Sequence, residues 1–579
     1  MAKEDVGVQD DTGHSSPVPK GGKVGKKSAV PYLDHLTVRL FAPGMSPLHR
    51  AGVGGLACTL HAMQQQYETG QLIESKLPGP YVNGVPPWEI QQDQVKLRFE
   101  SPENASEYLR KLFEFGFQIS NEGLIFLPGQ SSSTIHLPVL ADLQAGLTLT
   151  FLQHGKARDL LKEPASAMYS PEDGGEAGVV VQYRRCLSYK HQHGWEDVAK
   201  AIRTGPLKVE GPICPGNVVR HVAFTSVTAA AESAERMLAL YFALVGCLAL
   251  PINRGVGALI VPEVNDLKEF IYDRPAMTPM TAQACQVANA ADAGLQAQLR
   301  LRSSPLRLST VASQAKKTIE GLAIPACYTM TFAPTPWASQ QKSRVATLTV
   351  PRGDDKILAR FDRALALLPP RIKVITRKEA SGRGKEKKVV ERREAVRMDS
   401  VVRPMIAENL ARSRPWYSGF ASLMFKNNPA TDKPYLKQLQ YEQKGLHAMI
   451  SDPSMWDEEG EMLVVKAVHE AIRQSLGRIR EETDGKSSKG LSQATKNRWE
   501  RFRERLRLDL VGSKTPAQLR FALTDLFSRG GNNSVLRDGW TKVLPVIRCN
   551  WQLARDLGLL ALASYVGRER DEEESDSAT

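Results

Sequence analysis

The spacing of apolar residues changes at about residue 405. Upstream, Leu36, Val38 and Leu40 alternate with polar residues, which is typical of a half-buried strand. Strand-like and helix-like stretches of this kind alternate to about residue 375. Downstream the spacing is helical throughout: Met462, Val465, Val468, Ile472, Leu476 and Ile479 recur every three or four residues. We therefore predict an α+β N-terminal region with a mixed or antiparallel sheet, followed by an all-α C-terminal helical bundle of roughly five or six helices.

Local signals place several elements within these regions. Ser101 and Pro102 are suited to the N-cap and first position of a helix, and Thr515 and Pro516 to those of another. A last apolar helix is expected from about Trp551 to Val566. The longest apolar run, Met237–Leu250, predicts a buried helix that leads into a strand, and it is too short to span a bilayer. No membrane partner is implied.

Charge and cysteine usage limit the class of protein. The 579 residues are too many for one core and suggest two to four domains. The formal net charge of +13 favours a polyanionic partner, because each phosphate neutralised by a cation releases condensed counterions. The seven cysteines are scattered and never spaced CxxC, which argues against a disulfide framework or a zinc ribbon. We expect a soluble protein of the cytoplasm.

Basic residues concentrate in three places. Residues 1–30 are predicted to be a disordered basic arm, either a solubilising tail or a contact to a phosphate backbone. Residues 371–404 carry twelve basic and five acidic side chains and are predicted to be a basic linker between the α+β body (31–370) and the bundle (405–567). Residues 568–579 are predicted to be an acidic disordered tail.

The third basic cluster lies on a predicted helix of the bundle. Trp499, Phe502, Leu506 and Leu510 mark its apolar face, and the basic residues between them predict a positively charged solvent side. The candidate nucleic-acid-binding residues of the three clusters are Lys20, Lys23, Lys26, Lys27, Arg383, Lys385, Lys387, Lys388, Arg392, Arg393, Lys496, Arg498, Arg501, Arg503, Arg505 and Arg507. A solvated linker remains the alternative for the second cluster.

The search for catalytic motifs yields only fragments. The segment 20–27 resembles a phosphate-binding loop but lacks its first glycine and its Ser or Thr. The glycines of Gly52–Gly55 lack dinucleotide-binding spacing, so tight packing is the better interpretation. His469-Glu470 starts a zinc-protease pattern that ends in Arg473 instead of a second histidine. Asp266-Leu267-Lys268 is a similarly weak nuclease-like fragment. We therefore predict no catalytic residues and no cofactor.

Three potential metal ligands lie within the segment 186–193. Cys186, His191 and His193 are ligand types that lie close together in the sequence. Three such residues meet often by chance in a polar stretch, so we predict no metal there.

Four longer segments carry a family resemblance. Leu40–Gly52, Met277–Ala293, Arg414–Tyr417 and Leu557–Gly567 together resemble the large subunit of type I CRISPR effector complexes (Cascade), in the branch related to subtypes A and B. The resemblance spans about residues 33 to 567. These segments are apolar and structural, and it is their co-occurrence and order that carry the resemblance.

The resemblance implies a non-catalytic subunit that contacts the guide RNA's 5′ end, the short motif flanking the target in double-stranded DNA, and the displaced single strand. It also implies further effector-complex subunits and a helicase-nuclease or transposition apparatus as partners. We further expect an internally initiated small subunit, starting near Met398 or Met405. The alternative is a free-standing nucleic-acid-processing enzyme with an unrecognised active site.

Overall fold

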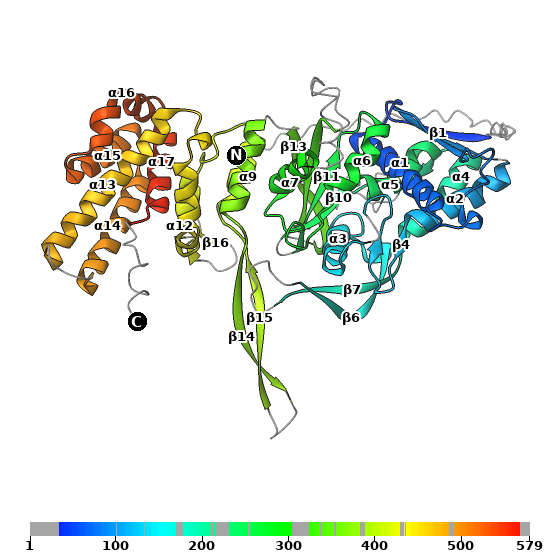
Figure 1. Ribbon diagram of the computed structural model, residues 1–579, viewed down its shortest axis with the longest axis horizontal. Helices are drawn as coiled ribbons and strands as arrows, with labels where there is room; N and C mark the ends of the chain where they lie inside the picture. The colour runs from blue at the N-terminus through cyan, green and yellow to red at the C-terminus, as the bar shows by residue number, and fades with distance from the viewer. Residues whose placement is uncertain are drawn as a thin grey trace, which may run out of the picture.

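The chain is described here from a computed structural model. The structure describes residues 34–567 except for residues 100, 132–133, 170–177, 210–212, 216–230, 253–254, 304–323, 336–337, 352–354, 382–387, 426, 429–432, 435 and 486–490. The predicted arm (1–30) and acidic tail (568–579) therefore lie outside the described residues. Figure 1 shows an elongated molecule, with the N-terminal region at one end of its long axis and the last helices at the other.

The N-terminal region mixes strands and helices, as predicted. Its helices are α1 (Pro47–Glu68), α2 (Pro102–Gly116), α3 (Leu137–Leu149), α4 (Gly194–Thr204), α5 (Ala234–Gly246), α6 (Leu267–Met277), α7 (Ala290–Ser303) and α9 (Asp355–Leu367). Its strands are β1 (His35–Arg39), β2 (Trp88–Ile90), β3 (Gln94–Arg98), β4 (Gln118–Ile119), β5 (Ile125–Phe126), β6 (Arg158–Tyr169), β7 (Val179–Tyr189), β8 (Leu207–Lys208), β9 (Ala231–Glu232), β10 (Leu248–Ile252), β11 (Val256–Pro262), β12 (Ala326–Thr335) and β13 (Ala338–Pro351).

Two antiparallel sheets organise this region. One has the order β1-β3-β2 and the other β10-β11-β12-β13. In the first, Leu36 lies opposite Leu97 and Val38 opposite Val95, and all four side chains are buried. Alternation along β1 thus turns one face toward the core, as the sequence pattern predicted. The run Met237–Leu250 is confirmed as the buried helix α5 leading into β10.

Helices α1 and α5 pack with their backbones almost in contact. A Cβ atom added to Gly52 would lie 1.7 Å from the carbonyl oxygen of Ala239, and one added to Gly246 would lie 1.7 Å from that of Ala51. Only hydrogen fits at such a distance. The glycines around residue 52 therefore serve tight packing, which confirms the interpretation preferred from the sequence.

Two long β-hairpins extend from the N-terminal region. The hairpin β6–β7 is followed, far along the chain, by β14 (Arg371–Ser381) paired antiparallel with β15 (Lys388–Met398). Figure 1 shows β14–β15 projecting away from the body, with its root beside β6–β7. The prediction of a linker is therefore wrong for residues 371–381 and 388–398, which form the two strands of this hairpin. Residues 382–387 lie outside the described part.

The C-terminal region is a run of helices, as predicted. These are α10 (Arg403–Ala411), α11 (Ala421–Phe425), α12 (Leu436–Ser451), α13 (Glu459–Asp484), α14 (Gln493–Gly512), α15 (Pro516–Gly530), α16 (Ser534–Cys549) and α17 (Trp551–Ser564). Only the two-residue strands β16 (Asn427–Asn428) and β17 (Lys433–Pro434) interrupt them in the described residues. Thr515 caps α15 by accepting a hydrogen bond from the backbone N–H of Gln518.

The core of these helices extends upstream of Arg371. Leu358, Phe361 and Ala364 of α9 are buried with residues of α10, α12 and α13 in one apolar cluster. Arg360 adds a polar link, because its guanidinium pairs with Asp457 at 2.9 Å. The helical region is thus built partly from residues that the sequence assigned to the α+β body. Among the described helices, none is long and apolar enough to cross a membrane.

Candidate nucleic-acid interface

The antiparallel pairing of β14 with β15 places basic residues of the two strands in register. Arg377 lies directly opposite Arg392, Thr376 opposite Arg393, and Ser381 opposite Lys388. Like charges in directly paired positions destabilise a hairpin unless a counterion lies between them. An arrangement of this kind suits a polyanion, since a phosphate placed at the pair relieves the repulsion.

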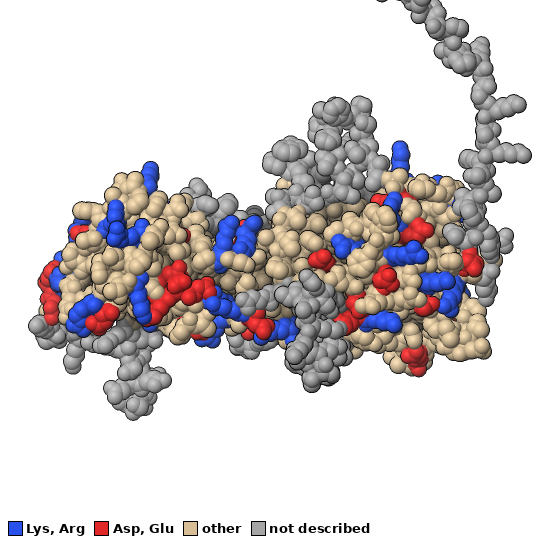
Figure 2. Space-filling view, turned by 90° about the horizontal axis from the view of Figure 1, so that it is seen from above, with Lys and Arg blue, Asp and Glu red and all other residues tan. Residues whose placement is uncertain are grey.

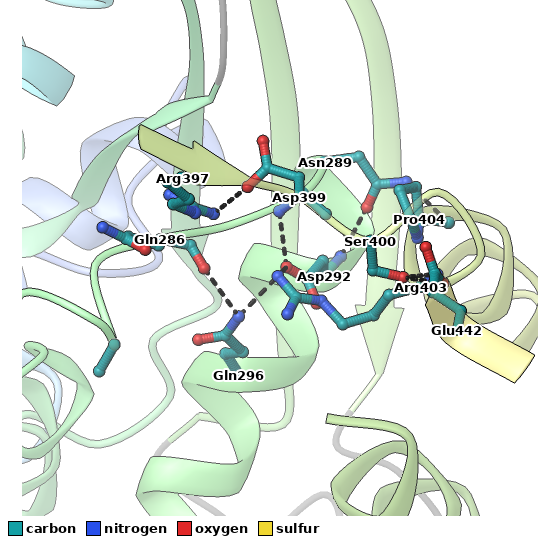
Figure 3. Close-up of polar contacts among 12 residues, drawn as sticks. Gln286, Asn289, Asp292, Gln296, Arg397, Asp399, Ser400, Arg403, Pro404 and Glu442 are labelled. Atoms are coloured by element: carbon teal, nitrogen blue, oxygen red, sulfur yellow. Dashed lines mark hydrogen bonds and ion pairs between the residues drawn. The ribbon is translucent and has the colours of Figure 1, made fainter. Parts of the chain in front are cut away.

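The root of the hairpin is fixed by a polar network that Figure 3 shows. Directly after β15, Arg397 forms an ion pair with Asp399 at 2.5 Å. The hydroxyl of Ser400 donates to the carboxylate of Glu442 at 2.7 Å and accepts a bond from the backbone N–H of Arg403 at 2.9 Å. Burial raises the pKa of Glu442, while hydrogen bonds from Val401, Ser400 and Val402 oppose that shift. The carboxylate of α12 thereby holds the chain that enters α10.

A buried ion pair joins this root to the N-terminal region. The guanidinium of Arg403 donates to Oδ2 of Asp292 in α7 at 3.2 Å, and the two side chains are 1% and 0% exposed. The same oxygen accepts from the backbone N–H of Ala288 at 2.7 Å and from Gln296 at 3.1 Å. Next to it, the amide of Asn289 donates to the carbonyl of Pro404 at 2.9 Å. The hairpin therefore leaves the molecule from a packed junction of α7, α10 and α12.

Arg397 and Arg403 were counted among the twelve basic residues of the predicted linker, but they are not available to a phosphate. Both are held inside the junction by carboxylates. The burial of Arg403 could not be predicted from the sequence, because its partner Asp292 lies 111 positions earlier in the chain. The positive charge that the segment offers to a partner is correspondingly smaller than its composition suggested.

Helix α14 carries the second set of candidates, and the structure divides them. Arg498, Arg501 and Arg505 are spaced by three and four residues, lie on one face, and are exposed. Arg498 is paired with Glu482 at 2.9 Å, and Arg505 lies 3.9 Å from Asp509. Lys496 is exposed on the opposite flank of the apolar face.

Arg503 and Arg507 depart from the prediction of a solvent-facing charge. Both are half-buried beside the apolar face of α14. Arg507 donates to the backbone carbonyl of Met424 at 2.8 Å and pairs with Glu504 at 2.6 Å. The guanidinium of Arg503 lies 5.9 Å from the ring centre of Tyr565, and burial lowers its pKa. These two side chains therefore join α14 to the rest of the bundle.

The other candidate residues belong to the N-terminal arm and to the hairpin. Seven of them lie outside the described residues: Lys20, Lys23, Lys26, Lys27, Arg383, Lys385 and Lys387. Lys388, Arg392 and Arg393 are placed by the backbone pairing of β15 alone. On the face seen in Figure 2, positive and negative side chains are interspersed among the described residues, and these form no continuous basic patch there.

The possible metal ligands do not converge. Cys186 is buried and its thiol donates to the carbonyl of Ser188, whereas His193 is exposed. His191 is 0% exposed, and the rings of Phe117 and Tyr241 lie within 5.8 Å of it, centre to centre. No group of three potential ligands that could hold a metal ion occurs among the described residues.

The environment of His191 makes a pH-dependent prediction. Burial, with a smaller contribution from Lys190, lowers its pKa to about 3, so the folded protein holds the neutral ring. The unfolded chain takes up a proton below about pH 6.5. Stability contributed by this group is therefore complete above pH 6.5 and is lost as the pH falls toward 3.

When the pH is lowered from 7 to 5, the unfolding free energy of the wild type should fall by about 2 kcal/mol more than that of His191→Phe, which lacks the titrating ring. Urea unfolding of both proteins at the two pH values measures the difference. Identical pH dependence, or stoichiometric zinc that is lost with the substitution, would contradict this placement of the ring.

The two fragments that resembled catalytic motifs have structural roles. Asp266 caps α6, because its carboxylate accepts from the backbone N–H groups of Lys268 and Glu269 at 2.9 and 3.2 Å. His469 contacts the carbonyl of Ala561 at 2.9 Å through Nε2, and burial lowers its pKa to about 4. Glu470 accepts hydrogen bonds from Arg473.

Comparisons with known proteins agree with this geometry. The DevT N-terminal domain matches residues 37–241, and the DevT C-terminal domain matches residues 452–579, which contain α13–α17. Over 567 residues, the chain is 33% identical to the CRISPR-associated protein Cas8a1/Csx13 of Myxococcus xanthus (strain DK1622), covering 96% of this chain and 92% of that protein. A likeness of this extent spans both regions of the fold and the hairpin between them. The chain belongs to the Cas8a1/Csx13 family, the large subunits of type I CRISPR effector complexes in the subtype A-like branch.

Proposed function

We propose that the chain is the non-catalytic large subunit of a cytoplasmic, RNA-guided DNA-targeting complex, and that the hairpin β14–β15 is one of its nucleic-acid contacts. The observation that carries this proposal is the paired positions of Arg377 and Arg392 on a projecting ribbon whose root is packed among α7, α10 and α12. A rigid root with a positively charged ribbon can position a phosphate backbone without reading its sequence. Base pairing with the guide RNA supplies the specificity.

The N-terminal region in this proposal contacts the guide RNA's 5′ end and the motif flanking the target, and the helical region contacts the displaced strand. The exposed face of α14 that carries Arg498, Arg501 and Arg505 supports the second contact. A helicase-nuclease or a transposition apparatus acts downstream. Purification of the complex from its native reading frames tests the assembly: a discrete guide RNA and several partner subunits should accompany the chain, and metal-dependent cleavage by the lone chain would favour an enzyme instead.

A separately made C-terminal small subunit, starting near Met398 or Met405, is part of the proposal. Either start loses α9, which is buried with α10 and α12, and a start at Met405 also loses Arg403. A start at Met449 would lose α10, α11 and most of α12 as well, with the buried Trp416, so the earlier pair remains favoured. The intact masses of the chains in the same preparation show whether either product is present.

Charge reversal in the hairpin is expected to weaken target binding while the fold is retained. In the variant, Lys388, Arg392 and Arg393 are replaced together by Glu. Each phosphate contact that is lost should reduce the slope of log K against log salt by about one. The affinity of the assembled complex for target DNA, measured at several salt concentrations, gives this slope.

The matched control reverses three exposed basic residues outside the hairpin and α14, Lys200, Lys208 and Lys268. It changes the net charge equally, so a general electrostatic effect would appear in both variants. If the hairpin variant and this control have the same affinity and slope as the wild type, the hairpin is a structural element and the proposed contact is wrong.

A further inference from the structure

A cleft beside the small sheet β1-β3-β2 has no role in the interface described above. It has a volume of about 800 Å³ and lies between the segment Glu74–Pro87 and helix α2. Pockets that hold small organic ligands commonly have volumes of about 300–1,000 Å³. Its lining consists of Glu74, Ser75, Leu77, Pro78, Gly79, Pro80, Val82, Val85, Pro86, Pro87, Arg98, Phe99, Asn104, Glu107, Tyr108 and Lys111.

One wall of the cleft is rigid although it is a loop. Four of its lining residues are prolines, whose φ angles are fixed by the ring. The hydroxyl of Tyr108 and the backbone N–H of Arg98 both donate to the carbonyl of Pro87, at 3.1 and 2.9 Å. The loop is therefore held against α2 and β3, and the cleft is preformed.

The opposite wall comes from one face of α2. Asn104, Glu107, Tyr108 and Lys111 follow one another by three, one and three residues, which places them on the same side of the helix. Tyr108 packs edge-on against Phe99 at 5.2 Å between ring centres, and the two rings, 2% and 6% exposed, form a largely buried aromatic floor. The cleft thus presents proline and aliphatic groups above this floor, with amide and carboxylate groups at the edge.

The charges around the cleft leave a cation for an anionic ligand. Glu107 is engaged by Arg110 at 2.6 Å, and this hydrogen bond lowers its pKa. Arg98 is paired with Glu89 at 2.7 Å but remains 47% exposed. Lys111 lies one helical turn after Glu107 and helps to lower the pKa of that carboxyl, but within the described residues no carboxylate forms an ion pair with it. A phosphate can therefore bind at Lys111, with Arg98 along the same rim.

The mouth of the cleft carries an apolar tip. Val82 and Val85 pair with each other across a two-residue turn, and they are 64% and 52% exposed. Asn83 and Gly84 have φ angles of 53° and 77°, which is typical of the tight type I′ turn of a hairpin. Exposed aliphatic side chains on such a rigid turn are of the kind that insert between stacked bases and unstack them.

We infer that this cleft binds a single unstacked nucleotide of the nucleic acid held by the complex. The base lies among the prolines and the aromatic floor, its edge near Asn104 and Glu74, and its phosphate near Lys111. Val82 and Val85 keep the neighbouring base from restacking. This inference rests on the proposed function, which supplies the nucleic acid, and it assigns a site that the hairpin and α14 do not provide.

Photocrosslinking within the assembled complex tests the site. One preparation carries 4-thiouridine in the guide RNA and a second carries 5-iodo-deoxyuridine in the target DNA, so the source of the nucleotide is identified by the arm that reacts. Mass spectrometry should find the crosslinked base on residues of the cleft in one of the two arms. Absence of cleft crosslinks from both arms, while other residues of the chain are crosslinked, would overturn the inference.

Two variants make the test quantitative. Ser75 is exposed and lines the cleft, so Ser75→Trp fills it with an indole while leaving the core untouched. Lys111→Glu removes the cation, and Lys200→Glu on α4 makes the same change of charge elsewhere. The crosslink yield should fall roughly tenfold in Ser75→Trp and in Lys111→Glu, and stay unchanged in Lys200→Glu.

The outcomes separate this inference from the proposed function. If the complex binds guide RNA and target through salt-sensitive contacts but both cleft variants keep the wild-type crosslink, only the cleft is misassigned. If the chain assembles with no nucleic acid at all, the proposed function fails as well. Unfolding temperatures of the two variants equal to that of the wild type show that a lost crosslink reflects the cleft.

Discussion

Replacing Arg403 with methionine is expected to destabilise the junction by about 3–5 kcal/mol. The substitution leaves the carboxylate of Asp292 buried without its ion-pair partner, although the N–H groups of Ala288 and Gln296 still donate to it. Removal of one partner from a buried pair costs far more than the pair contributes, because the remaining charge has lost its solvent. Urea unfolding followed by tryptophan fluorescence, to which the buried Trp416 and Trp456 contribute, measures the loss.

Two further variants distinguish this cause from a general loss of packing. The double variant Asp292→Leu/Arg403→Met removes both charges and should recover most of the lost stability. Arg498→Met breaks an exposed pair with Glu482 and should cost at most about 1 kcal/mol. If the double variant is as unstable as Arg403→Met, the uncompensated charge is not the reason.

Gly246→Ala is expected to cost at least about 3 kcal/mol, at the upper end of the usual range for overpacking. The new methyl group would lie 1.7 Å from the carbonyl oxygen of Ala51, and this atom belongs to the backbone of α1, which cannot rotate away. The two helices must separate and lose contacts along their length. Differential scanning calorimetry or urea unfolding measures the loss.

The control for this prediction is another glycine within a helix. A Cβ added to Gly477 in α13 meets no atom within 4 Å. Gly477→Ala should therefore be neutral, or stabilising by up to about 1 kcal/mol through the better helix propensity of alanine. Equal losses in the two variants would mean that the close approach of α1 and α5 is unimportant.

The elements that could be predicted from the sequence are those whose signals are local. The start of α2 at Ser101-Pro102, the buried helix α5 and the capped start of α15 each depend on a few neighbouring residues, and the structure confirms all three. The periodicity along α13 is of the same kind, since one face of a single helix is buried. Local sequence is enough to predict an element when the signal depends on that element alone.

The hairpin β14–β15 could not be predicted in this way. Its strands carry charged residues on both faces, so they lack the alternation that marks a strand with one buried side. The buried role of Arg403 and the inclusion of α9 in the second core depend on partners far away in the sequence. The walls of the cleft come from a loop and a separate helix. The spacing of residues within either element does not show that a cleft lies between them.

The shared core of α9 and the C-terminal helices has a consequence for synthesis on the ribosome. Phe361 and Ala364 emerge well before α12, which ends at Ser451 and helps to cover them. At about 5–20 residues per second, this apolar face stays uncovered for on the order of ten seconds. A nascent chain in this state is a substrate for chaperones, and premature termination before α12 is expected to yield aggregating protein.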